Sequence, residues 1–115
     1  MIYWANFVKV LQHKWFVLVA GLRVGGIPLW RLLFHDMSKF SWAEFGPYAR
    51  KFLGEKTAVT EFEFGLAWLN HENRNPHHWG YWIPRTGKHA GRPLPMPESY
   101  AREMVADWWG AGRSY

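Results

Sequence analysis

Histidine and aspartate side chains recur along this sequence in an order that suits metal binding. His35 and Asp36 are adjacent in the middle of an apolar run, and Lys39 follows about one helical turn later. Burying such polar groups costs free energy unless another group compensates them. Imidazole and carboxylate groups together are ligands for divalent manganese, iron and zinc ions. The candidate metal ligands are His13, His35, Asp36, His71, His77, His78 and Asp107.

Each of these residues taken alone has an ordinary explanation. A single histidine on an apolar helix, such as His13, is more often a hydrogen-bonded core residue than a ligand. The His77-His78 pair suits an exposed loop, and Asp107 suits a solvated helix face or a salt bridge. The ordered series indicates a metal site, because it includes both aspartates of the chain. Six or seven donors exceed what one tetrahedral ion needs, and they fit two ions that share the Asp36 carboxylate.

The elements that must position these residues follow helical patterns. Apolar residues recur at helical spacing, and no convincing strand or repeat is present. Ser41 with Glu44, and Thr60 with Glu63, have the spacing of capping boxes that open helices. We expect one domain over residues 1–115, folded as an all-α bundle of about five helices with the metal site at its centre. The expected helices cover residues 3–22, 28–40, 42–53, 60–73 and 97–109, with a long loop over 74–96.

The composition is that of a globular chain with many aromatic residues. Hydrophobic residues make up 49% of the 115 residues and charged residues 20%, and nine residues are tryptophan. The absence of cysteine excludes a disulfide framework and a cysteine-ligated zinc site. A net charge of +5 suits an anionic partner, although a basic solvated surface explains it as well. The aromatic excess leaves room for a homodimer interface.

Residues 15–34 come closest to a membrane-spanning pattern. Arg23, Arg31 and the break at Gly25-Gly26-Ile27-Pro28 argue against a spanning helix. The first fifteen residues lack the basic region and cleavage site of a signal peptide. We therefore expect no membrane association and a cytoplasmic location.

The ordered set H…HD…H…HH…D resembles the HD-domain superfamily of metal-dependent phosphohydrolases. The order is most similar to the binuclear phosphodiesterase branches, which include the HD-GYP domains. The stretch HDMSK is similar to the HD-x-G-K of that branch, with Ser38 where glycine is usual, but no GYP follows. More closely, most of the chain resembles an uncharacterised family of small bacterial and phage proteins, which brings no established activity.

The superfamily resemblance implies hydrolysis of a phosphate ester, such as a nucleotide, by a hydroxide formed from water between two ions. Asp36 would bridge the ions, and Lys39 would contact the substrate phosphate. The ions would be Mn, Fe, Co, Ni or Zn. One ion would be held by His13, His35 and Asp107, and the other by His71, His77 and His78.

Further residues are candidates for supporting roles. Glu103 is a candidate for the catalytic group, as a carboxylate that orients a histidine, and Glu72 is its rival. Arg74 is the best arginine for substrate phosphate, because it lies three residues from both His71 and His77. The aromatic residues Trp79, Tyr81 and Trp82 suit either base stacking or packing of the loop on the core.

Two other functions compete with hydrolysis. Some HD proteins hold two iron ions on the same ligand pattern and oxygenate their substrate. The positive charge and the aromatic residues also suit a non-enzymatic protein that binds nucleotides or nucleic acid, with a steep salt dependence of binding.

Overall fold

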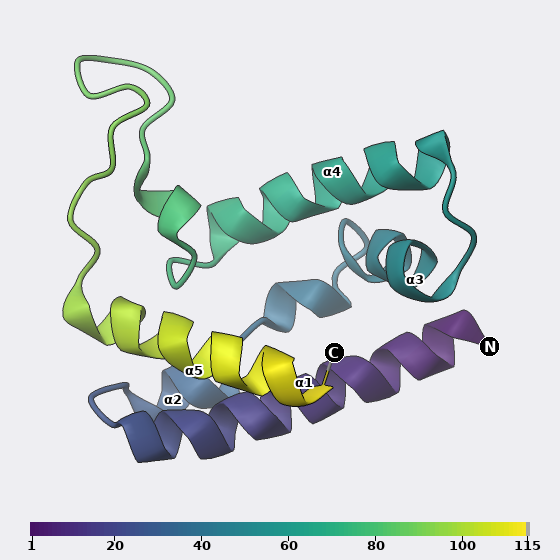
Figure 1. The fold of residues 1–115 in the computed structure, drawn as a ribbon, viewed down its shortest axis with the longest axis horizontal. Coiled ribbons are helices and arrows are strands. Elements are labelled where there is room, and N and C mark those ends of the chain that lie inside the picture. Colours follow the sequence, from purple (N-terminus) through teal and green to yellow (C-terminus); the bar gives the residue numbers. More distant parts are fainter. Residues whose placement is uncertain (115) are drawn as a thin grey trace.

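Helices account for all the regular structure in residues 1–114, which are the residues that the computed structural model describes (Figure 1). The all-α prediction of about five helices is therefore confirmed. Two short 3₁₀ helices, η1 and η2, lie between the α-helices. The bounds are α1 (Ile2–Val24), α2 (Leu29–Leu33), η1 (Met37–Phe40), α3 (Phe45–Leu53), α4 (Ala58–Arg74), η2 (Trp79–Trp82) and α5 (Glu98–Ser114).

The long helices α1 and α5 lie side by side and run in opposite directions (Figure 1). Their contact includes a small apolar core, in which Val17 and Ala20 of α1 meet Ala106 of α5 and Leu32 of α2. Helix α3 packs against both α1 and α4, and α4 lies on the far side of the fold from α1. In the described chain, buried polar or charged residues outnumber buried apolar ones by twelve to eight. The centre of the fold is therefore a polar cluster.

The predicted second helix is interrupted. Helix α2 ends at Leu33, Asp36 takes the left-handed conformation with φ 57°, and η1 begins at Met37. The Lys14 ammonium donates hydrogen bonds of 2.8 Å to the carbonyl oxygens of Leu33 and His35, which caps the end of α2. A continuous helix over 28–40 was the wrong prediction, because a contact from α1 stabilises the break.

Three other helix boundaries differ from expectation. Helix α3 starts at Phe45, and Ser41 donates a 2.5 Å hydrogen bond to the Ser38 carbonyl oxygen, so Ser41 and Glu44 form no capping box for it. The box that opens α4 pairs Thr57 with Thr60. Helix α5 continues past Gly110 to Ser114. Gly110 is thus a position of close packing, where an added Cβ would lie 2.6 Å from Val17 Cγ2.

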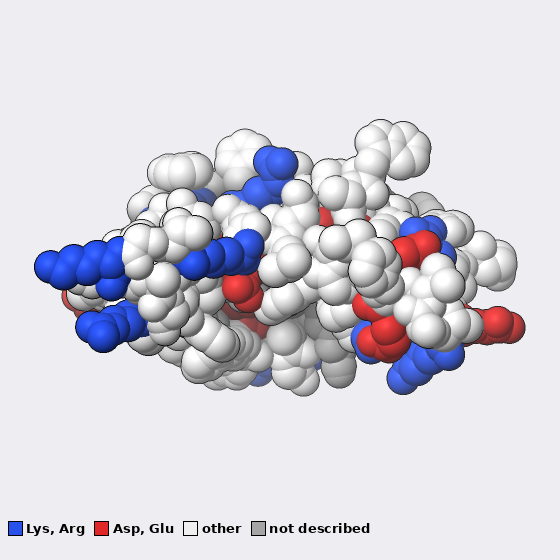
Figure 2. Space-filling view, turned by 90° about the horizontal axis from the view of Figure 1, so that it is seen from above, with Lys and Arg blue, Asp and Glu red and all other residues white. Residues whose placement is uncertain are grey.

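The segment between η2 and α5 forms an extended loop at one end of the fold (Figure 1). Hydrogen bonds from Gly91 N to the Pro84 oxygen and from Leu94 N to the Trp82 oxygen close it, at 2.8 and 2.9 Å. Arginine and lysine side chains extend from this end in Figure 2, whereas acidic and basic side chains are mixed at the other end. No helix within residues 1–114 combines the length and apolarity needed to cross a membrane.

Gly110 and Gly112 provide a matched test of the α1–α5 contact. Gly110→Ala should destabilise the protein by about 1–3 kcal/mol, because the new methyl group overlaps Val17. Gly112→Ala should stabilise it by about 0.5 kcal/mol, since nothing lies within 4 Å of its Cβ position and alanine favours a helix. Urea unfolding of the two variants measures both changes, and equal effects would contradict the close approach.

Candidate metal centre

All seven predicted ligands lie together at the centre of the fold. They come from five separate parts of the chain: α1, the α2–η1 turn, α4, the turn before η2, and α5. Six of them are buried, and His78 is partly exposed. The structure arranges them as two groups that share Asp36, namely His13, His35, Asp36 and Asp107, and Asp36, His71, His77 and His78.

The first group surrounds one oxygen of each aspartate. Asp107 Oδ1 lies 2.7 Å from His13 Nε2 and 3.1 Å from His35 Nε2. Asp36 Oδ2 lies 3.4 Å from His13 Nε2 and 3.3 Å from His35 Nε2. Four ligands placed tetrahedrally at zinc–nitrogen bond lengths would lie roughly 3.4 Å apart. Three of the observed separations, from 3.1 to 3.4 Å, are close to that value, whereas the 2.7 Å between His13 and Asp107 is a hydrogen-bond length that would have to increase to admit an ion.

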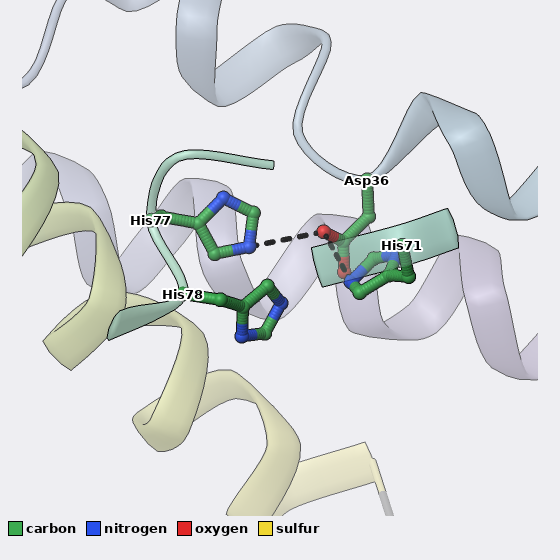
Figure 3. Close-up of side chains that lie close together, drawn as sticks. All are labelled: Asp36, His71, His77 and His78. Carbon is green, nitrogen blue, oxygen red and sulfur yellow. Dashed lines mark ion pairs between the residues drawn. The ribbon is translucent and has the colours of Figure 1, made fainter. Parts of the chain in front are cut away.

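The second group uses the other oxygen of Asp36. Its Oδ1 lies 3.4 Å from His71 Nε2 and 3.1 Å from His77 Nε2, and His78 lies beside both rings (Figure 3). Three buried atoms here, Asp36 Oδ1, His77 Nε2 and His78 Nε2, make no well-aligned hydrogen bond within residues 1–114, although the first two lie 3.1 Å apart. Leaving buried polar atoms unsatisfied is costly, and their convergence on one point fits a cation ligated there.

The left-handed backbone of Asp36 explains how two adjacent residues serve one site. Neighbouring residues on a continuous helix point about 100° apart. Here α2 ends at Leu33, before His35, and Asp36 is the only non-glycine residue among the described ones with positive φ. Aspartate adopts this conformation more readily than most residues. The turn brings the His35 ring and the Asp36 carboxylate to the same point.

Glu103 contacts two of the histidines at the ring nitrogens that face away from Asp36. Its Oε2 lies 2.8 Å from His35 Nδ1 and 3.0 Å from His77 Nδ1. An ionised carboxylate only accepts hydrogen bonds, so both Nδ1 atoms carry a proton and both Nε2 atoms face the centre. Arg31 Nε donates a 2.8 Å hydrogen bond to Glu103 Oε1. Glu103 is thus placed to orient ligands of both groups, whereas Glu72 lies against the backbone of Gly80.

Glu44 orients His71 in the same way, and the sequence did not predict this role of Glu44. Its side chain is fully buried, with Oε1 2.7 Å from His71 Nδ1 and Oε2 accepting a 2.7 Å hydrogen bond from Asn70. Ser38 Oγ lies 3.3 Å from the same His71 nitrogen. The spacing of Ser41 and Glu44 matched a capping box so well that it concealed the role of Glu44.

The electrostatic environment keeps the carboxylates ionised. Burial alone would raise the Asp36 pKa, but His35, Lys39 and His71 hold that pKa well below its usual value. Burial also opposes ionisation of Glu103, yet hydrogen bonds from His35 and His77 lower its pKa to about 2. Burial and the His77 and His71 imidazoles lower the pKa of His78 to about 3. His78 is therefore neutral at pH 7, as a metal ligand must be.

A cavity of about 410 Å³ opens onto the two groups. Lys39 lines it, with its ammonium 3.2 Å from Asp36 Oδ2 and 5.5 Å from the centre of the Tyr48 ring. Aromatic side chains supply much of the remaining wall, namely Tyr48, Phe52, Phe64, Trp68, Trp79 and Trp108. The candidate metal ligands that face this space are His13, Asp36, His71, His78 and Asp107.

Of the other residues that the sequence offers for contact with a substrate, Trp79 lines this cavity, and Arg74, Tyr81 and Trp82 do not. Arg74 donates from Nε to Asn70 Oδ1 at 2.9 Å and lines a second, smaller cavity, which the candidate ligands His35, Asp36 and His77 also line. The structure therefore does not bring Arg74 to the cavity that Lys39 lines. Trp82 donates from Nε1 to the Pro76 carbonyl oxygen at 2.7 Å, which is a packing role, whereas Trp79 lines the larger cavity.

Glu44→Gln tests the outer carboxylate. Loss of the charge beside His71 Nδ1 should weaken metal binding by about 10–100-fold, because such partners fix the ring and raise its basicity. Competition with a coloured chelator measures the affinity. The control Glu63→Gln alters a partly exposed ion pair with Arg50 on the surface, and should leave metal affinity unchanged. Equal affinities in the two variants would contradict the assigned role.

Comparisons with known proteins give a family and no activity. No curated protein and no solved structure is similar enough to the chain to count as a match. One family model, described as a family of unknown function (DUF5662), matches residues 3–115, and the chain therefore belongs to that family.

Proposed function

We propose that the protein is a metal-dependent phosphohydrolase or phosphodiesterase that acts on a small phosphate ester such as a nucleotide. The observation that carries this proposal is the sharing of Asp36 by two buried ligand groups that face one cavity. The order of the ligands along the chain, which is similar to that of binuclear HD-domain enzymes, adds support. Two divalent ions, when bound, would supply a water of lowered pKa as the nucleophile.

The chain's own residues have distinct parts in this scheme. Asp36 joins the two ligand groups, and Glu103 and Glu44 orient the histidines from outside, so Glu103 is a positioning residue here. Lys39 presents its ammonium to the cavity and is 8% exposed. A charge shielded from water acts more strongly on a phosphate oxygen that enters the cavity.

The cavity wall favours one kind of substrate. Lys39 is the only lysine or arginine among the described residues that line it. One cation suits a substrate with a single phosphate group better than a triphosphate. Trp79 and Trp108 are 63% and 58% exposed and border the same space, so a base or another flat apolar group has rings to stack on. A nucleoside monophosphate or a cyclic nucleotide combines both features.

Asp36→Asn is the most direct test of the shared carboxylate. Asparagine accepts the left-handed backbone and keeps the shape of the side chain, so the substitution removes mainly the charge. We expect wild-type protein to hold two divalent ions per chain and the variant to lose both metal and phosphatase activity. Elemental analysis and hydrolysis of p-nitrophenyl phosphate and bis(p-nitrophenyl) phosphate measure this, across Mn, Fe, Co, Ni and Zn.

The same measurements of metal content and hydrolysis also test a control variant and distinguish the alternative functions. His89→Ala removes a histidine from the exposed loop, outside both ligand groups, and should change neither readout. Protein that can be loaded with no metal would overturn the proposal. Turnover that requires iron and oxygen would replace it with a di-iron oxygenase. Nucleotide binding that survives in Asp36→Asn without hydrolysis, and weakens steeply with salt, would indicate a non-enzymatic binding protein.

Trp108→Ala tests the aromatic wall. A lost stacking contact is worth about 1–3 kcal/mol, so KM for a nucleoside monophosphate should rise roughly 5–100-fold while kcat changes little. Trp42→Ala is the matched control, since Trp42 is 100% exposed and lies outside this cavity. The same rise in KM for inorganic pyrophosphate, which has no base, would show that Trp108 acts through packing.

A further inference from the structure

Helix α1 is apolar on its outward face as well as on its buried face. Val10, Val17 and Ala20 are buried toward the rest of the fold, yet Trp4 and Trp15 are 69% and 61% exposed. Helix α1 forms the lower edge of the fold in Figure 1, and no other element lies beneath it. A continuous row of large apolar side chains on the outer face of a helix commonly marks an interaction surface. We define the outer stripe of α1 as Trp4, Val8, Leu11, Trp15, Leu18 and Leu22.

The outer stripe has the spacing of a coiled-coil seam. Its members are separated alternately by four and three residues, which is the a/d pattern of a heptad repeat over most of α1. Four of the six are exposed, namely Trp4, Leu11, Trp15 and Leu22, and Leu18 packs partly against the core. This regular spacing along a helix of 23 residues is suited to a second helix as its partner.

The basic residues of α1 argue against a lipid surface as the partner. An interfacial helix uses lysine and arginine beside its apolar face to contact lipid headgroups. Here Lys9 reaches the Ser114 carbonyl oxygen, at 3.4 Å, and Lys14 caps the end of α2. Both side chains are directed to neighbouring elements of the same chain, which leaves Arg23 in the last turn as the one exposed basic residue of α1. The outer stripe itself carries no charge that would select a partner of opposite charge.

The outer stripe is complementary to itself when two copies run antiparallel. A two-fold axis near residue 13 sets Trp4 opposite Leu22, Val8 opposite Leu18, and Leu11 opposite Trp15. Each tryptophan then meets a leucine, so large and smaller side chains alternate across the seam. Parallel pairing in register would set each tryptophan against its own copy. A two-fold interface must be self-complementary in this way.

We propose that the outer stripe of α1 binds the same stripe of a second copy of this chain, in an antiparallel helix pair. The exposed parts of the stripe amount to an area on the order of 500 Å² per chain. That is below the standard of about 800 Å² per partner, so the dimer forms reversibly and its population depends on concentration. His13 lies on the buried face of α1, so pairing leaves the metal cavity open.

Sedimentation velocity of the whole chain over a wide concentration range tests the proposal. We expect a monomer–dimer equilibrium for wild-type protein and loss of the dimer in Trp15→Glu. The exposed Trp42→Glu is the matched control and should retain the dimer, with circular dichroism confirming that both variants fold. A wild-type chain that stays monomeric at every concentration would overturn the proposal, and so would a dimer that persists in Trp15→Glu. Binding to vesicles of phosphatidylserine by a chain that is monomeric would instead identify a lipid surface.

Cysteine substitutions test the antiparallel arrangement, because the chain has no cysteine of its own. The double variant Leu11→Cys with Trp15→Cys should form a disulfide-linked dimer on oxidation, since these positions face each other across the axis. Trp4→Cys alone should remain unlinked, because its own copy lies at the far end of the pair. Efficient linking of Trp4→Cys, with none in the double variant, would contradict the antiparallel pairing.

Discussion

The carboxylate of Asp36 is the group on which the interior depends. It is 2% exposed, and its two oxygens lie within 3.4 Å of nitrogens from His13, His35, Lys39, His71 and His77. Burying one ionised carboxylate is costly, and these neighbours offset that cost only because five parts of the chain converge on it. The left-handed turn at Asp36 and the Lys14 cap behind it are consequences of placing the carboxylate there.

A second layer of carboxylates explains why the histidines converge with the same nitrogen inward. Glu103 and Glu44 accept hydrogen bonds from Nδ1 of His35, His77 and His71, which leaves Nε2 of each ring directed at Asp36. Glu103 also joins the two ligand groups, because it contacts one histidine from each. The two groups are therefore connected through both Asp36 and Glu103.

The sequence was enough to predict the features that depend on residue type and order. It was not enough where a contact with a residue distant in the chain determines the local structure or the role of a side chain. Helical spacing was enough for the all-α fold, and the rarity of aspartate drew attention to Asp36 and Asp107. The helix over 28–40 failed because Lys14, on another helix, stabilises a break that local propensity does not show. Glu44 was misassigned because its partner His71 is 27 residues away, whereas its local pattern with Ser41 matched a cap. Arg74 is near the candidate ligands in sequence, and it lines a second cavity beside His35, Asp36 and His77 instead of the cavity that Lys39 lines.

The polar centre also accounts for the aromatic surface. Histidines and carboxylates occupy the volume that an ordinary small domain fills with apolar side chains, so the apolar core contracts to a few small residues such as Ala20 and Ala106. The large apolar residues are displaced outward, where they border the cavity or cover the outer face of α1. Because the aromatic content exceeds what this core can bury, some of the rings that pack on the fold also form the wall of the cavity. The exposed tryptophans thus follow from the buried charge cluster, because the interior of this small fold has no room for both.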